Sequence, residues 1–124
     1  MTFSPTPPGT LLPEYTLTAQ ADGTYAATIQ FPERFAGVEG VVHGGVVSML
    51  FDEVLGSVAN HAPGEWWATA SLRVDYRAPS PIGQPLRVNI RLVQREGRKC
   101  TVRGQLYAGD LLCAEAEGLF VKVR

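Results

Sequence analysis

The stretch GVEGVVHGGVVSMLFDEVLGSVAN, residues 37–60, decides the fold. Glycines crowd its first part, and from residue 46 onward apolar residues recur every three or four positions. That spacing predicts a helix with one broad apolar face, running to about Asn60. The recurring apolar residues are Val46, Val47, Leu50, Val54, Leu55 and Val58. Two adjacent acids, Asp52 and Glu53, interrupt this helix, where a core-facing segment has no need of charge.

Strand-like sequence lies on both sides of this helix. Before it, Asp22-Gly23 separates two runs rich in Tyr, Thr and Ile, which predicts a hairpin with strands near 15–20 and 24–31. A loop punctuated by glycine and proline then leads to the helix. After the helix, alternation of apolar and polar residues predicts strands with one buried and one wet face. These strands lie within residues 66–79, 84–94, 100–108 and 111–124.

This order of elements predicts an α+β fold. An antiparallel sheet of about six strands must cover its apolar face, and the long central helix is the element available to cover it. A chain of 124 residues fits a single domain. Four prolines within residues 1–14 predict an extended arm, followed by one domain over residues 15–124.

Composition narrows the classes of function. The net charge of −1 provides no basic field for nucleic acid, so no such partner is expected. Cys100 and Cys113 lie far apart without a CxxC or a histidine pair, so we expect buried free thiols, no metal and no resident cofactor. The chain shows neither a leader pattern nor an apolar run of ~18 residues, so we expect no membrane partner and a cytoplasmic location.

One strip of the predicted helix combines small and polar residues. Ser48, Asp52 and Gly56 follow one another at one-turn spacing beside the apolar face, so Asp52 can point into a cleft. Gly44 and Gly45 are expected just before the helix, where unpaired N–H groups and the helix dipole favour a carbonyl oxygen or an oxyanion. A carboxylate and a donor in one cleft suit attack on an activated carbonyl. Solvated helix charges and an ordinary glycine turn remain the alternative.

Two segments carry a resemblance to a known family. GVVHGGVVSMLFDEVLG, residues 40–56 with a His-Gly-Gly motif, and TASLRVDYRAPSPIGQPLRV, residues 69–88, resemble the hotdog-fold acyl-CoA thioesterases of the phenylacetate-pathway type. These belong to the 4-hydroxybenzoyl-CoA thioesterase superfamily. The resemblance covers roughly residues 24–124. It implies a hotdog fold, in which a curved antiparallel sheet wraps a long helix, and hydrolysis of an aromatic or medium- to long-chain acyl-CoA.

The resemblance also implies roles for individual residues. Asp52 would be the catalytic carboxylate, as general base or nucleophile, and the Gly44 N–H would polarise the thioester carbonyl. His43 would shape the Gly44 loop, and Thr69 would help to place the water, unless it is an ordinary strand threonine. Many relatives carry Asn where this chain has Gly37; another branch has Gly there, which implies a different subgroup.

Substrate contacts are predicted around the same loop. Gly37 and Gly45 are expected to lie against the substrate, and the REGRK turn with Arg98 and Lys99 is the candidate for the phosphates of coenzyme A. A solvated, charged turn explains these two residues equally well. Arg73, Arg77 and Arg95 are the other basic candidates. The acyl pocket is expected to draw on apolar residues of the helix and loop, unless most of them are simply core. These residues are Phe35, Val38, Met49, Leu50, Leu55, Trp66 and Trp67.

The resemblance further implies a homodimer whose sheets join edge to edge, with active sites between subunits and a homotetramer as dimer of dimers. An exposed sheet edge favours such pairing on physical grounds. Coenzyme A enters only as part of the substrate. Two other functions stay open: a non-catalytic acyl-CoA sensor and a hotdog hydratase or dehydratase. The latter needs a catalytic histidine across the site, and the chain offers only His43 and His61.

Overall fold

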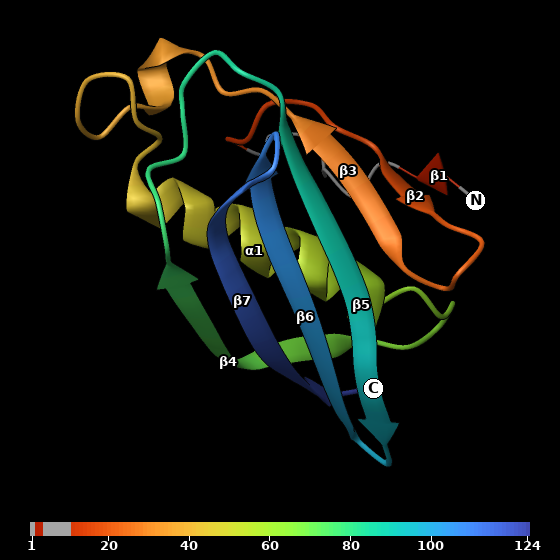
Figure 1. Ribbon diagram of the computed structural model, residues 1–124. Helices are drawn as coiled ribbons and strands as arrows, with labels where there is room; N and C mark the ends of the chain where they lie inside the picture. Colours follow the sequence, from red (N-terminus) through yellow and green to blue (C-terminus); the bar gives the residue numbers. More distant parts are fainter. Residues whose placement is uncertain (1, 4–10) are drawn as a thin grey trace.

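The computed structural model describes residues 2–3 and 11–124 (Figure 1). Within these ranges it has a long helix, a short 3-10 turn and an antiparallel sheet, so the predicted α+β order is confirmed. The helices are η1 (Glu33–Phe35) and α1 (Gly44–Ala59). The strands are β1 (Thr2–Phe3), β2 (Leu17–Ala19), β3 (Tyr25–Ile29), β4 (Trp67–Tyr76), β5 (Leu86–Glu96), β6 (Lys99–Ala108) and β7 (Leu111–Lys122).

The strands form one sheet in the order β1-β2-β3-β5-β6-β7-β4. Every neighbouring pair is antiparallel. The strand β4 follows the helix in sequence but lies at the far edge of the sheet, where it pairs with β7. The helix thus carries the chain across the sheet, and in the described part of the chain one edge of β4 has no neighbouring strand.

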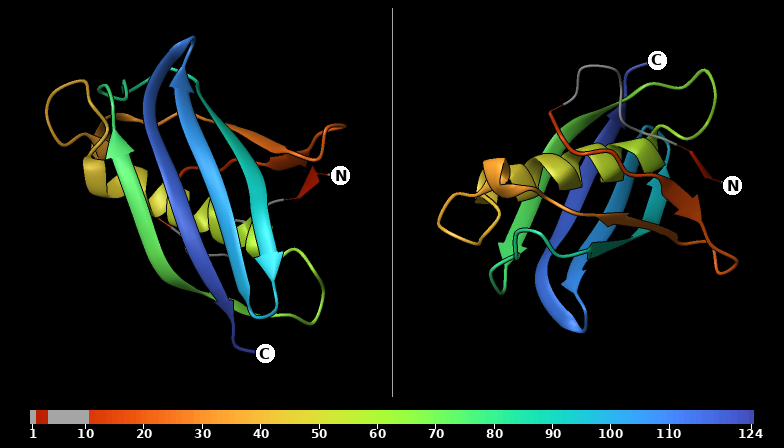
Figure 2. Two further views of the ribbon diagram at one scale, coloured as in Figure 1. Left: turned by 60° about the horizontal axis from the view of Figure 1, so that its bottom comes forward. Right: turned by 90° about the horizontal axis from the view of Figure 1, so that it is seen from above.

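The helix fills the concave side of the sheet (Figure 2). Leu50, Phe51, Val54 and Leu55 have no exposed surface, and they pack on side chains of the central strands. These strand residues are Leu86, Val88, Ile90, Val102, Leu106, Ala114, Ala116 and Phe120. The periodicity of the sequence therefore identified the buried face of the helix correctly.

Two glycines let the helix approach the sheet closely. A Cβ atom on Gly118 of β7 would lie 2.6 Å from the ring of Phe120, and one on Gly104 of β6 would lie 3.1 Å from Leu55 and 3.2 Å from Phe51. Phe51 and Leu55 of the helix therefore rest on strand backbone at Gly104. At Gly118 the nearest side chain is Phe120 of the same strand, and Leu55 of the helix would lie 3.4 Å away. The sheet can curve around α1 without a void.

The N-terminal region and the end of β5 differ from expectation. Leu12, within the expected arm, and Tyr15 are both 5% exposed and join the core. The pairing of β1 with β2 adds a two-residue strand to the six that were expected. The division of the chain at residue 14 stays a prediction. Leu92, expected to be buried, is 40% exposed although it lies opposite the buried Val102, and a bulge follows it between Leu92 and Gln94.

The two cysteines are free and buried, as predicted. Cys100 lies on β6 with 1% of its surface exposed, and its burial raises the pKa of the thiol. A raised pKa and low exposure both make a thiol unreactive. Their role in the described structure is packing.

Two glycine-to-alanine changes should move stability in opposite directions. Gly118→Ala forces a methyl group against Phe120 in a closed core, and we expect a loss of about 1–3 kcal/mol in the free energy of unfolding. Gly56→Ala lies within α1, where the new Cβ would sit 3.5 Å from Phe120, and a gain of about 1 kcal/mol is expected from helix propensity. Urea unfolding measures both, and equal effects of the two changes would contradict the close seating of the helix.

Candidate active site

The start of α1 is built by the His-Gly-Gly motif. His43 is the N-cap, and its Nδ1 accepts a hydrogen bond from the Gly45 N–H at 2.9 Å. Gly44 and Gly45, expected just before the helix, form its first turn instead. Because Nδ1 is an acceptor here, the neutral imidazole carries its proton on Nε2. The N–H of Gly45 is therefore occupied, whereas that of Gly44 has no acceptor within residues 2–3 and 11–124.

The loop before the helix folds back against His43. The His43 N–H donates to the Phe35 carbonyl at 2.8 Å, and the Gly37 N–H donates to the Val41 carbonyl at 3.0 Å. A Cβ atom on Gly37 would lie 3.2 Å from both Cα and Cδ2 of His43. Glycine at this position thus lets the loop pack tightly on the histidine. A side chain there would require His43 to shift by a few tenths of an ångström.

Asp52 and Thr69 are brought together across the helix and the edge strand. The Thr69 hydroxyl on β4 donates to Oδ1 of Asp52 at 2.8 Å, and both side chains are exposed. The other carboxylate oxygen, Oδ2, has no partner among the described residues. One oxygen is therefore held in place, and the other is open to a ligand or to water.

A β-bulge decides which way Thr69 points. Thr69 lies opposite Phe120 and Ser71 lies opposite Leu119, so Ala70 is an extra residue in β4. Side chains alternate along a strand, and an extra residue reverses the alternation beyond it. If Ala70 instead took its own place opposite Phe120 in a regular ladder, Thr69 would face away from the helix. The bulge returns Thr69 to the helix-facing side, the same side as its buried neighbour Phe120.

Tyr76 forms a second tie between β4 and α1. Its hydroxyl lies 2.6 Å from the Gly44 carbonyl oxygen and 2.6 Å from the Ser48 hydroxyl. The alternation of β4 marked Tyr76 as an apolar position, and this polar contact was missed. The sequence does hold a signal for it, because Gly44 and Ser48 precede Asp52 at intervals of four on one helical strip.

Several residues predicted to line an acyl pocket belong to the core. Leu50 and Leu55 are 0% exposed and Trp67 is 6% exposed, because they face the sheet or the helix end. The pocket prediction is wrong for these three. Met49 on α1 is 41% exposed and Val38 in the loop is 68% exposed, so both are accessible to a ligand.

Two aromatic residues named for the pocket are held by neighbours. The Phe35 ring packs edge-on against Phe31 at 5.3 Å between centroids. Trp66 is 58% exposed, and the Arg124 guanidinium lies 4.3 Å from its ring centre. Phe35 stays beside the His43 loop, whereas Trp66 lies beyond the end of α1.

The basic candidates lie on the sheet and its turns. Arg98 and Lys99 are exposed at the β5–β6 turn, and the Arg98 Nη2 donates to the Lys122 carbonyl at 2.6 Å. No contact joins either residue to Asp52 in the described part of the chain. The other three basic candidates form ion pairs: Arg73 with Asp75, Arg77 with Glu115 and Arg95 with Glu65.

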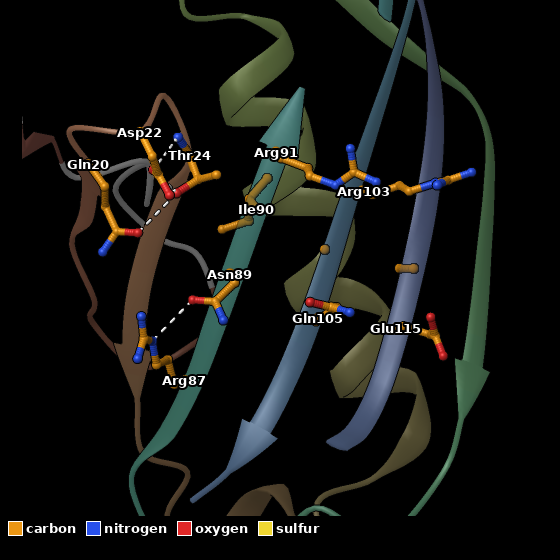
Figure 3. Close-up of a pocket in the computed structure, with 12 residues that line it drawn as sticks. Gln20, Asp22, Thr24, Arg87, Asn89, Ile90, Arg91, Arg103, Gln105 and Glu115 are labelled. Carbon is orange, nitrogen blue, oxygen red and sulfur yellow. Dashed lines mark hydrogen bonds between the residues drawn. The ribbon is translucent and has the colours of Figure 1, made fainter. Parts of the chain in front are cut away.

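A polar hollow of about 420 Å³ opens on the opposite face of the sheet, away from α1 (Figure 3). Arg91 and Arg103 lie directly opposite each other there, and Arg87 donates to the Asn89 side chain at 3.0 Å. None of the predicted site residues lines this hollow. The sheet separates it from the pair of Asp52 and Thr69.

The described residues also bear on metal binding and on membrane crossing. Residues 2–3 and 11–124 contain no group of three or more His, Cys, Asp or Glu side chains that could hold a metal ion. In the same ranges, no helix has both the length and the apolar character needed to cross a bilayer.

Comparison with known proteins identifies the family. The model of the thioesterase superfamily matches residues 39–115, which include the start of α1, Asp52, Thr69 and Tyr76. The chain belongs to the thioesterase superfamily. A bovine relative, acyl-coenzyme A thioesterase THEM4, is 34% identical over 89 residues, which cover 70% of this chain and 36% of that protein. The chain thus spans about a third of this relative's length.

Solved structures share the fold, among them one described as a thioesterase superfamily protein. The protein RHA08564 superposes with a TM-score of 0.78 at 37% identity, over 86% of this chain and 55% of that one. The Bacillus halodurans protein BH2602, solved with CoA, has a TM-score of 0.76 at 23% identity, over 87% of this chain and 73% of that one. The hotdog fold predicted from the sequence is thereby confirmed.

Deletion of Ala70 should leave Thr69 facing Asp52. The deletion removes the extra residue while Thr69 stays opposite Phe120 and Ser71 stays opposite Leu119, so we expect a loss of less than about 2 kcal/mol in the free energy of unfolding. The matched change Thr69→Val keeps the bulge and removes only an exposed hydroxyl, and we expect a loss of less than about 1 kcal/mol. Urea unfolding compares the two variants. A loss above about 3 kcal/mol in the deletion variant, as expected if buried residues such as Trp67 had turned outward, would contradict this account of the bulge.

Proposed function

We propose that this chain hydrolyses an acyl-CoA thioester to a free acid and coenzyme A. The observation that carries the proposal is the Asp52 carboxylate, held at one oxygen by Thr69 and open at the other. The free Gly44 N–H at the positive end of the same helix supplies the donor for the carbonyl oxygen. The bovine relative bears the name acyl-coenzyme A thioesterase, which supports the same substrate class.

The proposed reaction needs few groups. Sulfur stabilises a carbonyl only weakly and leaves readily as thiolate, so one carboxylate and one or two oriented donors suffice. As general base, Asp52 takes a proton from water while the water oxygen bonds to the carbonyl carbon. The carbonyl oxygen becomes an oxyanion that accepts the Gly44 N–H. Its collapse breaks the C–S bond, and the leaving CoA thiolate takes up the proton held by Asp52, which regenerates the carboxylate.

Asp52 has a second possible role in the proposal. As a nucleophile, its free oxygen would attack the carbonyl carbon and displace the thiolate, forming a mixed anhydride that water then cleaves. The exposed Oδ2 serves either course. Thr69 holds the carboxylate in both, and in the first it also helps to place the water.

The geometry of α1 argues for a site shared between two chains. Gly44 and Asp52 are eight residues apart on the helix, which corresponds to about 12 Å along its axis. In the reaction, the donor lies ~2.9 Å from the carbonyl oxygen and the attacking water lies ~3 Å from the carbonyl carbon. The distance from the donor to the carboxylate that binds this water is therefore shorter than the separation along the helix. We therefore propose that Gly44 of one chain works with Asp52 of a second copy.

The open edge of β4 offers a way to bring the two chains together. Gly44 contacts Tyr76 at one end of β4, and Asp52 contacts Thr69 near the other end. Antiparallel pairing of two copies of β4 would set the Gly44 end of each chain beside the Asp52 region of the other. The proposed homodimer would then contain two equivalent sites. A further pairing of dimers into a tetramer belongs to the same proposal.

The remaining contacts of the proposal concern the substrate. Gly37, Phe35 and Met49 would border the acyl group around the His43 loop, where Gly45 lines the helix start. Arg98 and Lys99 are exposed and would be available to coenzyme A phosphates, as point charges at the rim. A non-catalytic acyl-CoA sensor is the second candidate, since the same surface could bind without turnover.

Removal of the carboxylate tests the catalytic claim. We expect Asp52→Asn to lower kcat by about 10²–10⁴-fold on whichever acyl-CoA is cleaved fastest, because the amide is neither a base nor a nucleophile. Thiol release from aromatic and straight-chain acyl-CoAs provides the measurement. Glu53→Gln is the matched control, because this neighbouring acid accepts a bond from Tyr15 at 2.6 Å, and glutamine keeps an acceptor.

Equal activity of Asp52→Asn and the unaltered protein would refute the role of Asp52. Tight binding of acyl-CoA by the unaltered protein, without release of thiol from any member of the panel, would favour the sensor. A fall in activity that Glu53→Gln reproduces would point to the fold of the helix rather than to the carboxylate.

Complementation tests the shared site. Gly44→Pro removes the N–H at the first helical position, where proline is well accepted, and the extended backbone of His43 (φ −55°, ψ 134°) suits a following proline. We expect Gly44→Pro and Asp52→Asn each to keep at most about 1% of the activity alone and their refolded mixture to recover roughly a quarter of it, since half of randomly formed dimers would hold one intact site. Gly44→Ala, which keeps the N–H, is the control. No recovery on mixing would contradict a site formed by two chains.

A further inference from the structure

We infer that Tyr76, supported by Ser48, is a positioning residue for the oxyanion donor. The inference rests on the proposed function, in which the Gly44 N–H binds the thioester carbonyl oxygen. Tyr76 itself does not touch the reacting atoms in this scheme. It fixes the peptide group that joins Gly44 to Gly45. The Gly44 N–H belongs to the preceding peptide, whose His43 carbonyl accepts from the N–H groups of Val46 at 2.9 Å and Val47 at 3.1 Å. With that peptide held as well, the contact of Tyr76 completes the restraint on the backbone of Gly44 and so on its N–H.

The single proton of the Tyr76 hydroxyl decides which partner donates in each of its two hydrogen bonds. A phenol hydroxyl has one proton, and that proton goes to the Gly44 carbonyl oxygen at 2.6 Å. The Ser48 hydroxyl, also at 2.6 Å, must therefore donate to the Tyr76 oxygen. The result is a directed chain of hydrogen bonds from Ser48 to Tyr76 to Gly44. Each bond in such a chain polarises the next and strengthens it.

The peptide between Gly44 and Gly45 is held at both ends. Tyr76 binds its carbonyl, and Nδ1 of His43 binds its N–H at 2.9 Å. Because a peptide group is planar, two contacts on opposite sides fix the orientation of the whole plane. The first helical turn would otherwise be weakly defined, since it consists of two glycines, the residues with the widest backbone freedom.

The exposed position of Tyr76 favours a role at the site. The residue is 53% exposed on the edge strand, yet its hydroxyl has two close partners. Its ring also covers the first turn, because a Cβ atom on Gly44 would lie 3.6 Å from ring atoms of Tyr76. An exposed tyrosine contributes little to the core, so the tie to Gly44 is its main contact with α1.

The test compares two tyrosine-to-phenylalanine changes. Tyr76→Phe removes the hydroxyl bound to Gly44, and we expect kcat to fall by roughly tenfold to a hundredfold while KM stays within about threefold, because loss of an oxyanion-hole donor affects mainly kcat. Ser48→Ala should change kcat in the same direction but less. Tyr107→Phe on β6 is the matched control, since no partner of its hydroxyl lies among residues 2–3 and 11–124.

A double-mutant cycle separates positioning from general stabilisation. In the Gly44→Pro background the donor is already absent, so adding Tyr76→Phe should lower kcat no further. A purely structural role would add its full effect in that background. Full kcat in Tyr76→Phe, measured against an active unaltered protein, would overturn the inference and leave the proposed function intact.

Amide hydrogen exchange keeps the inference testable if no acyl-CoA is hydrolysed. Tyr76→Phe should accelerate exchange at Gly45, because the peptide loses one of its two anchors, whereas Tyr107→Phe should not. Unchanged exchange at Gly45 would show that Tyr76 does not hold this peptide. If no protein releases thiol and exchange at Gly45 is accelerated in Tyr76→Phe alone, the proposed function is refuted. The inference that Tyr76 holds the peptide between Gly44 and Gly45 is then still supported.

Discussion

The burial of one face of α1 against the curved sheet is the contact on which the rest of the structure depends. Leu50, Phe51 and Leu55 seat the helix on the strands, and Gly104 and Gly118 allow it to approach the strand backbone. A helix seated so closely cannot rotate without a clash in a close-packed core. Its rotation therefore fixes where its polar strip points, and that strip runs along the edge strand β4.

Two structural features bring side chains of β4 to the polar strip of α1. At one end the ring of Tyr76 reaches the first helical turn, and its hydroxyl binds Gly44 directly. Near the other end a bulge at Ala70 turns Thr69 toward Asp52. Neither contact follows from apolar packing, because the polar groups involved are exposed. The apolar core thus sets where the polar strip of α1 meets β4, and a few hydrogen bonds orient the polar groups there.

Much of this architecture could be predicted from the sequence, because periodicity is a local property. Alternation in the strands and the helical spacing after Gly45 identified the elements, and the spacing of Asp52 on the helix placed it outside the core. The pairing register between strands that are distant in sequence cannot be predicted from that local pattern. Regular alternation back from Leu72, Val74 and Tyr76 would put Thr69 on the face away from the helix, and the sequence carries no sign of the bulge at Ala70 that reverses this. The role of Gly44 as first helical residue depends likewise on a cap from His43.

The open edge of β4 connects the fold to the proposed chemistry. An unpaired edge with exposed residues over 68–71 is a liability in an isolated chain, since it can pair with any other strand. The rigidity of α1 creates a second problem, because it holds Gly44 and Asp52 about 12 Å apart along one axis. Pairing of two such edges would answer both at once. It would cover the edge and supply, from the neighbouring chain, the group that each helix holds too far away. The assembly would then be a condition for the proposed reaction and not an addition to it.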